Sequence, residues 1–485
     1  MKKVELAVFV MIAVLVCFGC KTAPEVITTD TYYVSASGND ANNGLTAKTP
    51  FKTLKKALDT AKGEGAYKII TVLGVLNAAS EGVGEGSSVF AARTTGVAVI
   101  TIKGGDAAAA LSALDAGKRV IEIVGNAYIR LENIEVSGGA ITDPDIAKGG
   151  GGGILVAAST TNGATLIAGK GAVIKSNRAQ VGGGVVVIGT GSSFTLDGGE
   201  VRENSSATDG GGILAAGSTL TITAGTVDSN TAAVQGGGVS VYTGAALTFV
   251  GGEITGNQAE DGGGLHIIGN AVMQGGSISR NSSPSNGGGV SVKTGGNFTL
   301  TGGDIRDNTA LTAGGGVSVF EGTFVMQNGL IANNTAISAT ASEGAFKENG
   351  TGGGVFVIQG SFELSGGAIT GNTANNSGGG VNANQGSTFT MSGGEIGGNS
   401  AVFGGGGVAV LGANARFKKT GGIIYGFDAP AEQRNTTTQD GNSVDVSRNS
   451  DLRQAVITDI KRRKNTAATD LDSTKNGADG GWDIR

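Results

Sequence analysis

A Gly-Gly-Gly triplet followed by an aliphatic residue occurs ten times, at intervals of 25 to 38 residues. The triplets end at Gly153, Gly184, Gly212, Gly238, Gly264, Gly289, Gly316, Gly354, Gly380 and Gly407. A unit of about 26 residues cannot bury its apolar side alone, so consecutive units must stack on one another. The repeat therefore predicts a solenoid rather than several globular domains.

A second mark recurs in each unit, where an aliphatic residue is followed three positions later by asparagine. The nine asparagines are Asn177, Asn204, Asn230, Asn257, Asn281, Asn308, Asn334, Asn372 and Asn399. A side-chain amide both donates and accepts, so amides that stack from rung to rung can bond along the axis. These residues are predicted to form a structural asparagine ladder.

Between the two marks, apolar residues alternate with a period of two, which is the period of a strand. Val239 and Val241 flank Ser240, and the equivalent pair in the next unit flanks His266. A second short segment of each unit has the pattern Phe-x-Leu, as at Phe298. The pattern thus predicts about three short strands in each unit, joined by turns of Gly, Asn and Ser. Stacked units would give an all-β fold with internal files of Val/Ile, Phe and Asn side chains.

Acidic residues support the stacking of units. Glu200, Glu253 and Asp304 follow a Gly-Gly pair in alternate units, while Thr226 and Ser277 occupy the same position in the units between them. Like charges on consecutive rungs would repel at under about 5 Å.

The overall composition agrees with a folded chain. Of 485 residues, 90 are Gly, but only 5 are Pro and 39% are hydrophobic, which argues against collagen and against disorder. The net charge of −5 argues against a nucleic-acid partner.

Residues 1–19 have the pattern of an export signal. Lys2 and Lys3 precede an apolar run that is too short to span a membrane. The following Gly19-Cys20 resembles the lipobox of bacterial lipoproteins, which implies lipidation of Cys20 and attachment of the protein to a membrane through this lipid, with residues 20–30 as a tether. The expected location is the outer membrane or cell surface; an ordinary secretory signal, with a periplasmic or secreted product, is the alternative. No cysteine follows Cys20, so no disulfide is expected in the exported chain.

The chain flanking the repeats is expected to close the solenoid. Residues 31–148 should form an N-terminal cap and irregular first coils, including a short capping helix with Thr49 as N-cap and Pro50 at the first helical position. Residues 149–427 hold the repeats, in which Lys419 stands at an inward position and Phe427 at the last Asn position. Residues 428–485 form a charged cap or tail, whose Lys461–Lys464 run is interpreted as a solvated face.

The opening segment from Tyr32, including Gly38-Asn39-Asp40 and Thr49-Pro50-Phe51, resembles that of right-handed parallel β-helix proteins of the pectate-lyase-like class. The Gly triplets and aliphatic-x-x-Asn pairs are similar to the repeats of polymorphic outer-membrane proteins, which are surface adhesins. The resemblance implies a right-handed parallel β-helix (solenoid) with a short N-terminal capping helix. It implies adhesion more than catalysis, because these repeats encode the scaffold.

The repeats show few residues suited to catalysis. Glu260-Asp261 is their only adjacent acidic pair and is expected in a solvated turn, and the sole histidine, His266, is expected on an outward surface position. We therefore expect no catalytic residue, metal or cofactor, although a polysaccharide lyase or hydrolase of the pectate-lyase-like class remains an alternative.

The outward positions of the strand after each triplet are rich in apolar residues. They include Leu155, Val186, Ile188, Leu214, Tyr242, Ile268, Phe320, Phe356, Ile358 and Leu411. Apolar strips of this kind often mark contact sites, so Tyr242, Phe320, Phe356 and Ile358 are the candidate residues for binding a glycan or an extracellular-matrix protein. Two alternatives remain open: the insertion at Ile337 to Gly350 or the C-terminal tail covers the strip, or the protein is a purely structural surface coat.

Overall fold

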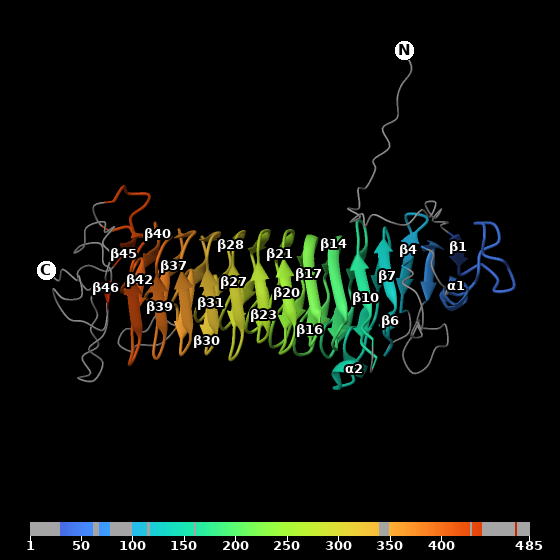
Figure 1. Ribbon diagram of the computed structural model, residues 1–485, viewed down its shortest axis with the longest axis horizontal. Coiled ribbons are helices and arrows are strands. Elements are labelled where there is room, and N and C mark those ends of the chain that lie inside the picture. Colours follow the sequence, from blue (N-terminus) through green and yellow to red (C-terminus); the bar gives the residue numbers. More distant parts are fainter. Residues whose placement is uncertain are drawn as a thin grey trace, which may run out of the picture.

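A computed structural model describes residues 30–61, 67–77, 99–113, 117–159, 162–338, 349–426, 429–438 and 471–472. The chain winds from one end of a long rod to the other in a parallel β-solenoid (Figure 1). Cys20, the export signal, Phe427 and the Lys461–Lys464 run lie outside the described residues.

Each turn contributes strands to three parallel columns, because its alternating apolar segments are separated by Gly and Asn corners. Column 1 follows the Gly triplets and is an 11-stranded sheet. Its strands are β6 (Ile121–Val124), β9 (Ile154–Ala157), β13 (Val185–Ile188), β16 (Ile213–Ala216), β19 (Val239–Val241), β22 (Leu265–Ile267), β26 (Val290–Val292), β30 (Val317–Phe320), β34 (Val355–Ile358), β38 (Val381–Ala383) and β42 (Val408–Val410).

Column 2 contains the Phe-x-Leu segments and extends to the N-terminal end. Its strands are β1 (Asp30–Ser35), β2 (Lys68–Leu73), β4 (Ile100–Gly104), β7 (Tyr128–Glu132), β10 (Thr165–Ala168), β14 (Ser193–Arg202), β17 (Thr219–Asp228), β20 (Ala246–Phe249), β23 (Asn270–Met273), β27 (Asn297–Leu300), β31 (Thr323–Met326), β35 (Ser361–Leu364), β39 (Thr388–Met391) and β43 (Arg416–Lys419).

Column 3 lies beyond the Gly-Gly corner, and β14 and β17 continue into it. Its other strands are β3 (Val75–Asn77), β5 (Ala110–Ser112), β8 (Glu135–Ser137), β11 (Val173–Lys175), β21 (Glu253–Thr255), β24 (Ser277–Ser279), β28 (Asp304–Arg306), β32 (Leu330–Ala332), β36 (Ala368–Thr370), β40 (Glu395–Gly397) and β44 (Ile423–Ile424). Two-residue strands follow the ladder asparagines: β12 (Arg178–Ala179), β15 (Ser205–Ser206), β18 (Thr231–Ala232), β25 (Ser282–Ser283), β29 (Thr309–Ala310), β33 (Thr335–Ala336), β37 (Thr373–Ala374), β41 (Ser400–Ala401) and β45 (Thr436–Thr437).

The register places equivalent residues of successive units directly above one another. Ser240 pairs with His266, and His266 pairs with Ser291. The five rings from Phe298 to Phe417 stack in column 2 with centroid separations of 4.7 to 5.1 Å. The internal files predicted from the repeat are therefore confirmed.

The predicted asparagine ladder is also confirmed, and all nine members are buried. Each Nδ2 donates to Oδ1 of the next asparagine at 2.9 to 3.0 Å. The same Oδ1 accepts the backbone N–H of the preceding asparagine. The ladder ends one rung later than predicted, because Asn435 accepts from Asn399, so assigning this position to Phe427 was wrong.

The register confirms that the column 3 carboxylates skip rungs. Glu200 pairs with Thr226, Thr226 with Glu253, and Glu253 with Ser277. A neutral residue therefore separates each pair of acids along the axis, so the strands meet without direct repulsion.

At the N-terminal end, the short helix α1 (Leu54–Ala61) packs against β1 and β2, with Leu54, Ala57 and Leu58 buried. It begins later than predicted, since Phe51 forms a parallel bridge with Val34. The cap is therefore Thr53, whose Oγ1 accepts the N–H of Lys56, rather than Thr49.

At the other end, Lys419 pairs with Met391 and is fully buried, as its inward position predicted. Burial lowers the pKa of this ammonium group. Strand β46 (Leu471–Asp472) pairs antiparallel with β43 and so covers part of the last rung. Neither α1 nor the four-residue α2 (Ile146–Gly149) has the length and hydrophobicity that a bilayer-crossing helix needs, and the described residues contain no other helix.

Candidate functional site

A fourth layer of backbone lies over the outer side of column 1. It consists of the residues just before the Gly triplets, which bridge from rung to rung; we call this layer the cover. Its members include Asp209, Gln235, Asp261, Asn286, Ala313 and Thr351. The cover touches the strands beneath it: Ser240 Oγ donates to the carbonyl of Gln235 at 3.1 Å, and a Cβ on Gly236 would lie 2.3 Å from Ser240 Oγ.

The apolar strip predicted on the outer side of column 1 is largely buried by the cover and not exposed to solvent. Leu155, Val186, Leu214 and Phe356 are at most 5% exposed. The first three form a small apolar cluster, against which Ile146 of α2 and other partly buried residues pack. The prediction that Phe356 binds a ligand assumed an exposed ring, and this assumption was wrong because the ring faces the cover and not solvent.

In each unit, the outward residue that follows two positions later in the sequence is not fully covered. These residues form a file along the edge of column 1, which we call the ridge: Ile188, Ala216, Tyr242, Ile268, Lys293, Phe320, Ile358, Asn384 and Leu411. All are half-buried except Phe320, which is 37% exposed. Three of the four predicted binding residues, Tyr242, Phe320 and Ile358, thus belong to one partly exposed file.

Tyr242 is tied to the cover. Its hydroxyl donates to Asp209 Oδ2 at 2.7 Å. Burial raises the pKa of this phenol, and the adjacent Asp209 carboxylate raises it further. Burial also raises the pKa of Asp209, although the hydrogen bond from Tyr242 opposes this effect. The hydrogen bond to Asp209 therefore fixes the position of the Tyr242 ring on the ridge.

Lys293 connects the ridge to the cover. Its Nζ lies 3.0 Å from Asp261 Oδ2 and 5.7 Å from the centre of the Phe320 ring. Asp261 Oδ1 also accepts from the backbone N–H and Nδ2 of Asn286, at 3.3 Å each. The Glu260-Asp261 pair is thus not a simple solvated turn, because Asp261 is paired on both oxygens while Glu260 is exposed.

His266 lies beneath this ion pair and not on the surface as predicted. It is fully buried, and neither ring nitrogen has a hydrogen-bond partner among the described residues. Burial and, to a smaller extent, the charge of Lys293 lower the pKa of His266 to about 4, although Asp261 partly opposes both effects. The imidazole is neutral at neutral pH.

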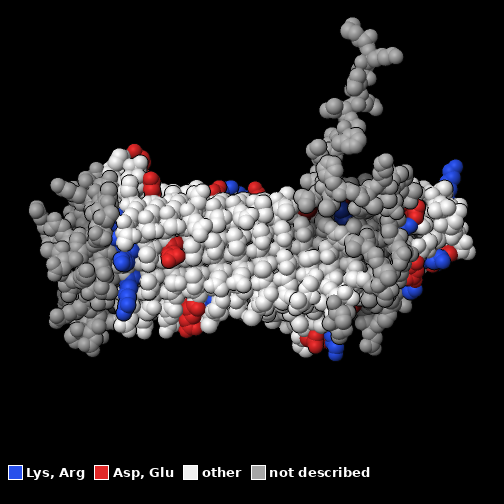
Figure 2. Space-filling model, viewed as in Figure 1, with Lys and Arg blue, Asp and Glu red and all other residues white. Residues whose placement is uncertain are grey.

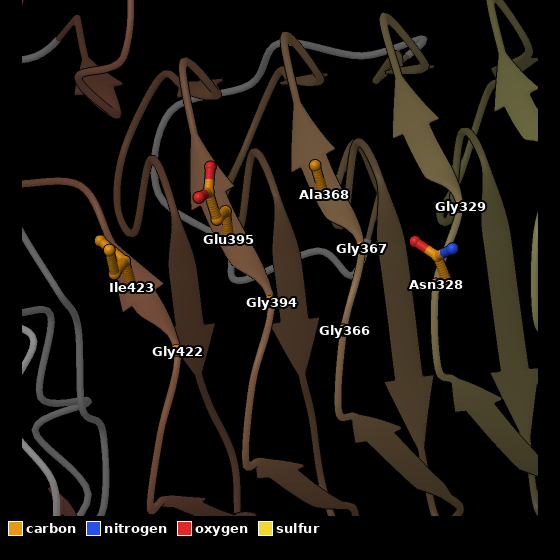
Figure 3. A pocket seen from close by; sticks show the side chains of 9 residues that line it. All are labelled: Asn328, Gly329, Gly366, Gly367, Ala368, Gly394, Glu395, Gly422 and Ile423. Carbon is orange, nitrogen blue, oxygen red and sulfur yellow. The ribbon is translucent and has the colours of Figure 1, made fainter.

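A groove of about 580 Å³ runs along the corner between columns 2 and 3, and the repeat pattern did not reveal it (Figure 3). It is lined by Asn328, Gly329, Gly366, Gly367, Ala368, Gly394, Glu395, Gly422 and Ile423. A Cβ on Gly366 would lie 2.3 Å from the carbonyl oxygen of Gln327, so this position of the turn leaves no room for a side chain, and backbone forms much of the groove floor. Consecutive Gly-Gly pairs are the signal that could have indicated it.

Within the part of the chain that the structure describes, no three His, Cys, Asp or Glu side chains converge to hold a metal ion. Glu395 is the single carboxylate of the groove, and Tyr425 donates to it at 3.3 Å.

No protein-family model matches the chain, and no curated protein matches its sequence.

Proposed function

We propose that the protein is a lipid-anchored binding protein of the cell surface, which contacts a glycan or an extracellular-matrix protein through the ridge of column 1. The observation that carries this proposal is the exposed Phe320 ring within a file of mostly apolar side chains. Buried hydrophobic files account for the fold, whereas an aromatic ring held open to solvent is suited to a sugar face or a partner side chain.

The rest of the rod favours a partner of low charge. The outward residues of column 2 are uncharged from Thr219 to Val325, and Figure 2 shows few charged side chains on the middle of the visible face. Such a surface offers hydroxyl and amide groups but little long-range attraction. We propose binding without catalysis, and the resemblance to adhesin repeats supports this choice over a lyase, a hydrolase or a passive coat.

The ridge can be tested with a matched pair of aromatic substitutions. Phe320→Ala is expected to weaken binding about 5- to 150-fold, because a central aromatic contact contributes about 1 to 3 kcal/mol. Phe403→Ala is the control, since Phe403 is 44% exposed but lies outside the ridge. Binding would be measured on immobilised glycans and matrix proteins. Equal binding by wild type and both variants would contradict a role for the ridge.

The anchor requires a separate test. Cys20→Ser is expected to abolish incorporation of labelled fatty acid and to move the protein from the membrane fraction to the soluble fraction, because several acyl chains supply the attachment. Cys17→Ser is the control and should leave both properties unchanged. Continued lipid labelling of the Cys20→Ser protein would refute lipidation at this residue.

A further inference from the structure

We infer that the rung of β22 is an acid-sensitive latch, in which a proton on His266 breaks the Asp261–Lys293 ion pair and loosens the cover over column 1. The inference rests on the proposed function only in that the ridge borders the latch. The latch itself is a property of the fold and can be measured without a ligand.

The position of His266 is unusual for its file. The residues above and below it in column 1 are Ser240 and Ser291, and all three are fully buried beneath the cover. Ser240 donates to the backbone of Gln235, whereas Ser291 Oγ and both nitrogens of His266 lack a partner among the described residues. The structure therefore accommodates a neutral imidazole but provides no hydrogen-bond acceptor for a protonated one among the described residues.

A protonated imidazole has two N–H donors and needs acceptors for them. The charged groups that act on the ring are Lys293 at the end of β26 and Asp261 in the cover, while β19 places only the neutral Ser240 beside it. Asp261 already accepts from Lys293 and Asn286. A charged His266 can be stabilised only by taking Asp261 from Lys293 or by reaching water, and either change displaces the cover.

The direction of the pH effect follows from linkage. The pKa of about 4 in the closed state lies below the ordinary value of 6.5, so the closed state binds protons less readily than the open state. Closure is undisturbed above pH 6.5 and weakens as the pH falls toward 4. These two pKa values correspond to an opening constant that rises about 100-fold between pH 7 and pH 4.

The link to the ridge is Lys293. When Asp261 turns to His266, the ammonium group loses its carboxylate partner but remains beside the Phe320 ring. Acid therefore changes the charge and the mobility of the ridge next to its exposed aromatic residue. We expect ligand contact and cover opening to respond to the same proton.

The test uses the fact that the chain has one histidine. In the full-length protein, the imidazole resonance followed by NMR should titrate well below pH 6. Hydrogen exchange, corrected for the intrinsic rate at each pH, should show a loss of protection at Gln235, Asp261 and Asn286 between pH 7 and pH 4. Strand β39 serves as a remote internal reference and should stay protected.

His266→Ser is the matched variant, since it repeats the residue of the adjacent rungs. We expect its cover to keep its protection at pH 4. Titration of His266 near pH 6.5, or equal opening of the cover in wild type and His266→Ser, would overturn the latch. Neither result would affect the Phe320→Ala comparison at neutral pH, so the latch and the proposed function can fail independently.

Discussion

Asn257→Asp is expected to lower the free energy of unfolding by about 4 kcal/mol, although it changes one buried atom group. Asn257 Nδ2 donates at 2.9 Å to the carbonyls of Val227 and Thr255 and to Oδ1 of Asn281. A carboxylate cannot donate, so three oxygen atoms would face a buried negative charge. Denaturant unfolding of the two proteins at pH 7 measures the difference.

The control for this substitution is the same change on the surface. Asn270 is exposed in column 2, and its Oδ1 only accepts from Asn297 Nδ2 at 3.1 Å, which an aspartate can also do. Asn270→Asp should therefore cost less than about 0.5 kcal/mol. Acid should partly restore Asn257→Asp, because a protonated carboxyl regains one donor. Similar losses of unfolding free energy for both variants would mean that the hydrogen bonds of the ladder do not stabilise the fold as predicted.

Gly237→Ala is expected to destabilise the protein by about 3 kcal/mol or more through overpacking. The added Cβ would lie 2.4 Å from the carbonyl oxygen of Gln258 and 2.5 Å from that of Gly263. Both contacts are to the backbone of the neighbouring turn, so neither can yield by rotation of a side chain. Thermal unfolding followed by circular dichroism gives the measurement.

Gly295→Ala separates crowding from backbone strain. Gly295 has φ +80°, and nothing lies within 4 Å of an added Cβ, so its substitution should cost only the strain of about 1 to 2 kcal/mol. Gly237 carries no such positive φ, and its loss should come from contact alone. A smaller loss for Gly237→Ala than for Gly295→Ala would show that the stacked turns can move apart.

Much of the fold was predictable because each unit repeats the same residues at the same offsets. In a parallel stack, the neighbours of an inward residue are its own counterparts, so the Asn257 to Asn281 bonds and the Phe298 to Phe324 contact follow from spacing. The terminal elements were less predictable, because no repeated counterpart constrains them. Thus α1 begins after Phe51, and the last ladder position falls on Asn435.

The candidate site was only partly predictable. Alternation separates inward from outward residues, but it does not show whether an outward residue meets water. Phe356 and His266 are both outward in column 1 and both buried, whereas Phe320, further along its strand, is exposed. The cover that causes this difference consists of the turns preceding the Gly triplets, and their path depends on how the stacked rungs close.

By itself, the amino-acid sequence determined the period, the strands and the internal files, since these depend on local alternation and on contacts between identical positions. Only the tertiary structure decided which outward side chains reach solvent, how Lys293 joins Asp261 to Phe320, and that a lone imidazole is enclosed. The physical reason is that burial outside the core depends on a second layer of backbone, and no residue pattern within one strand specifies what lies over it.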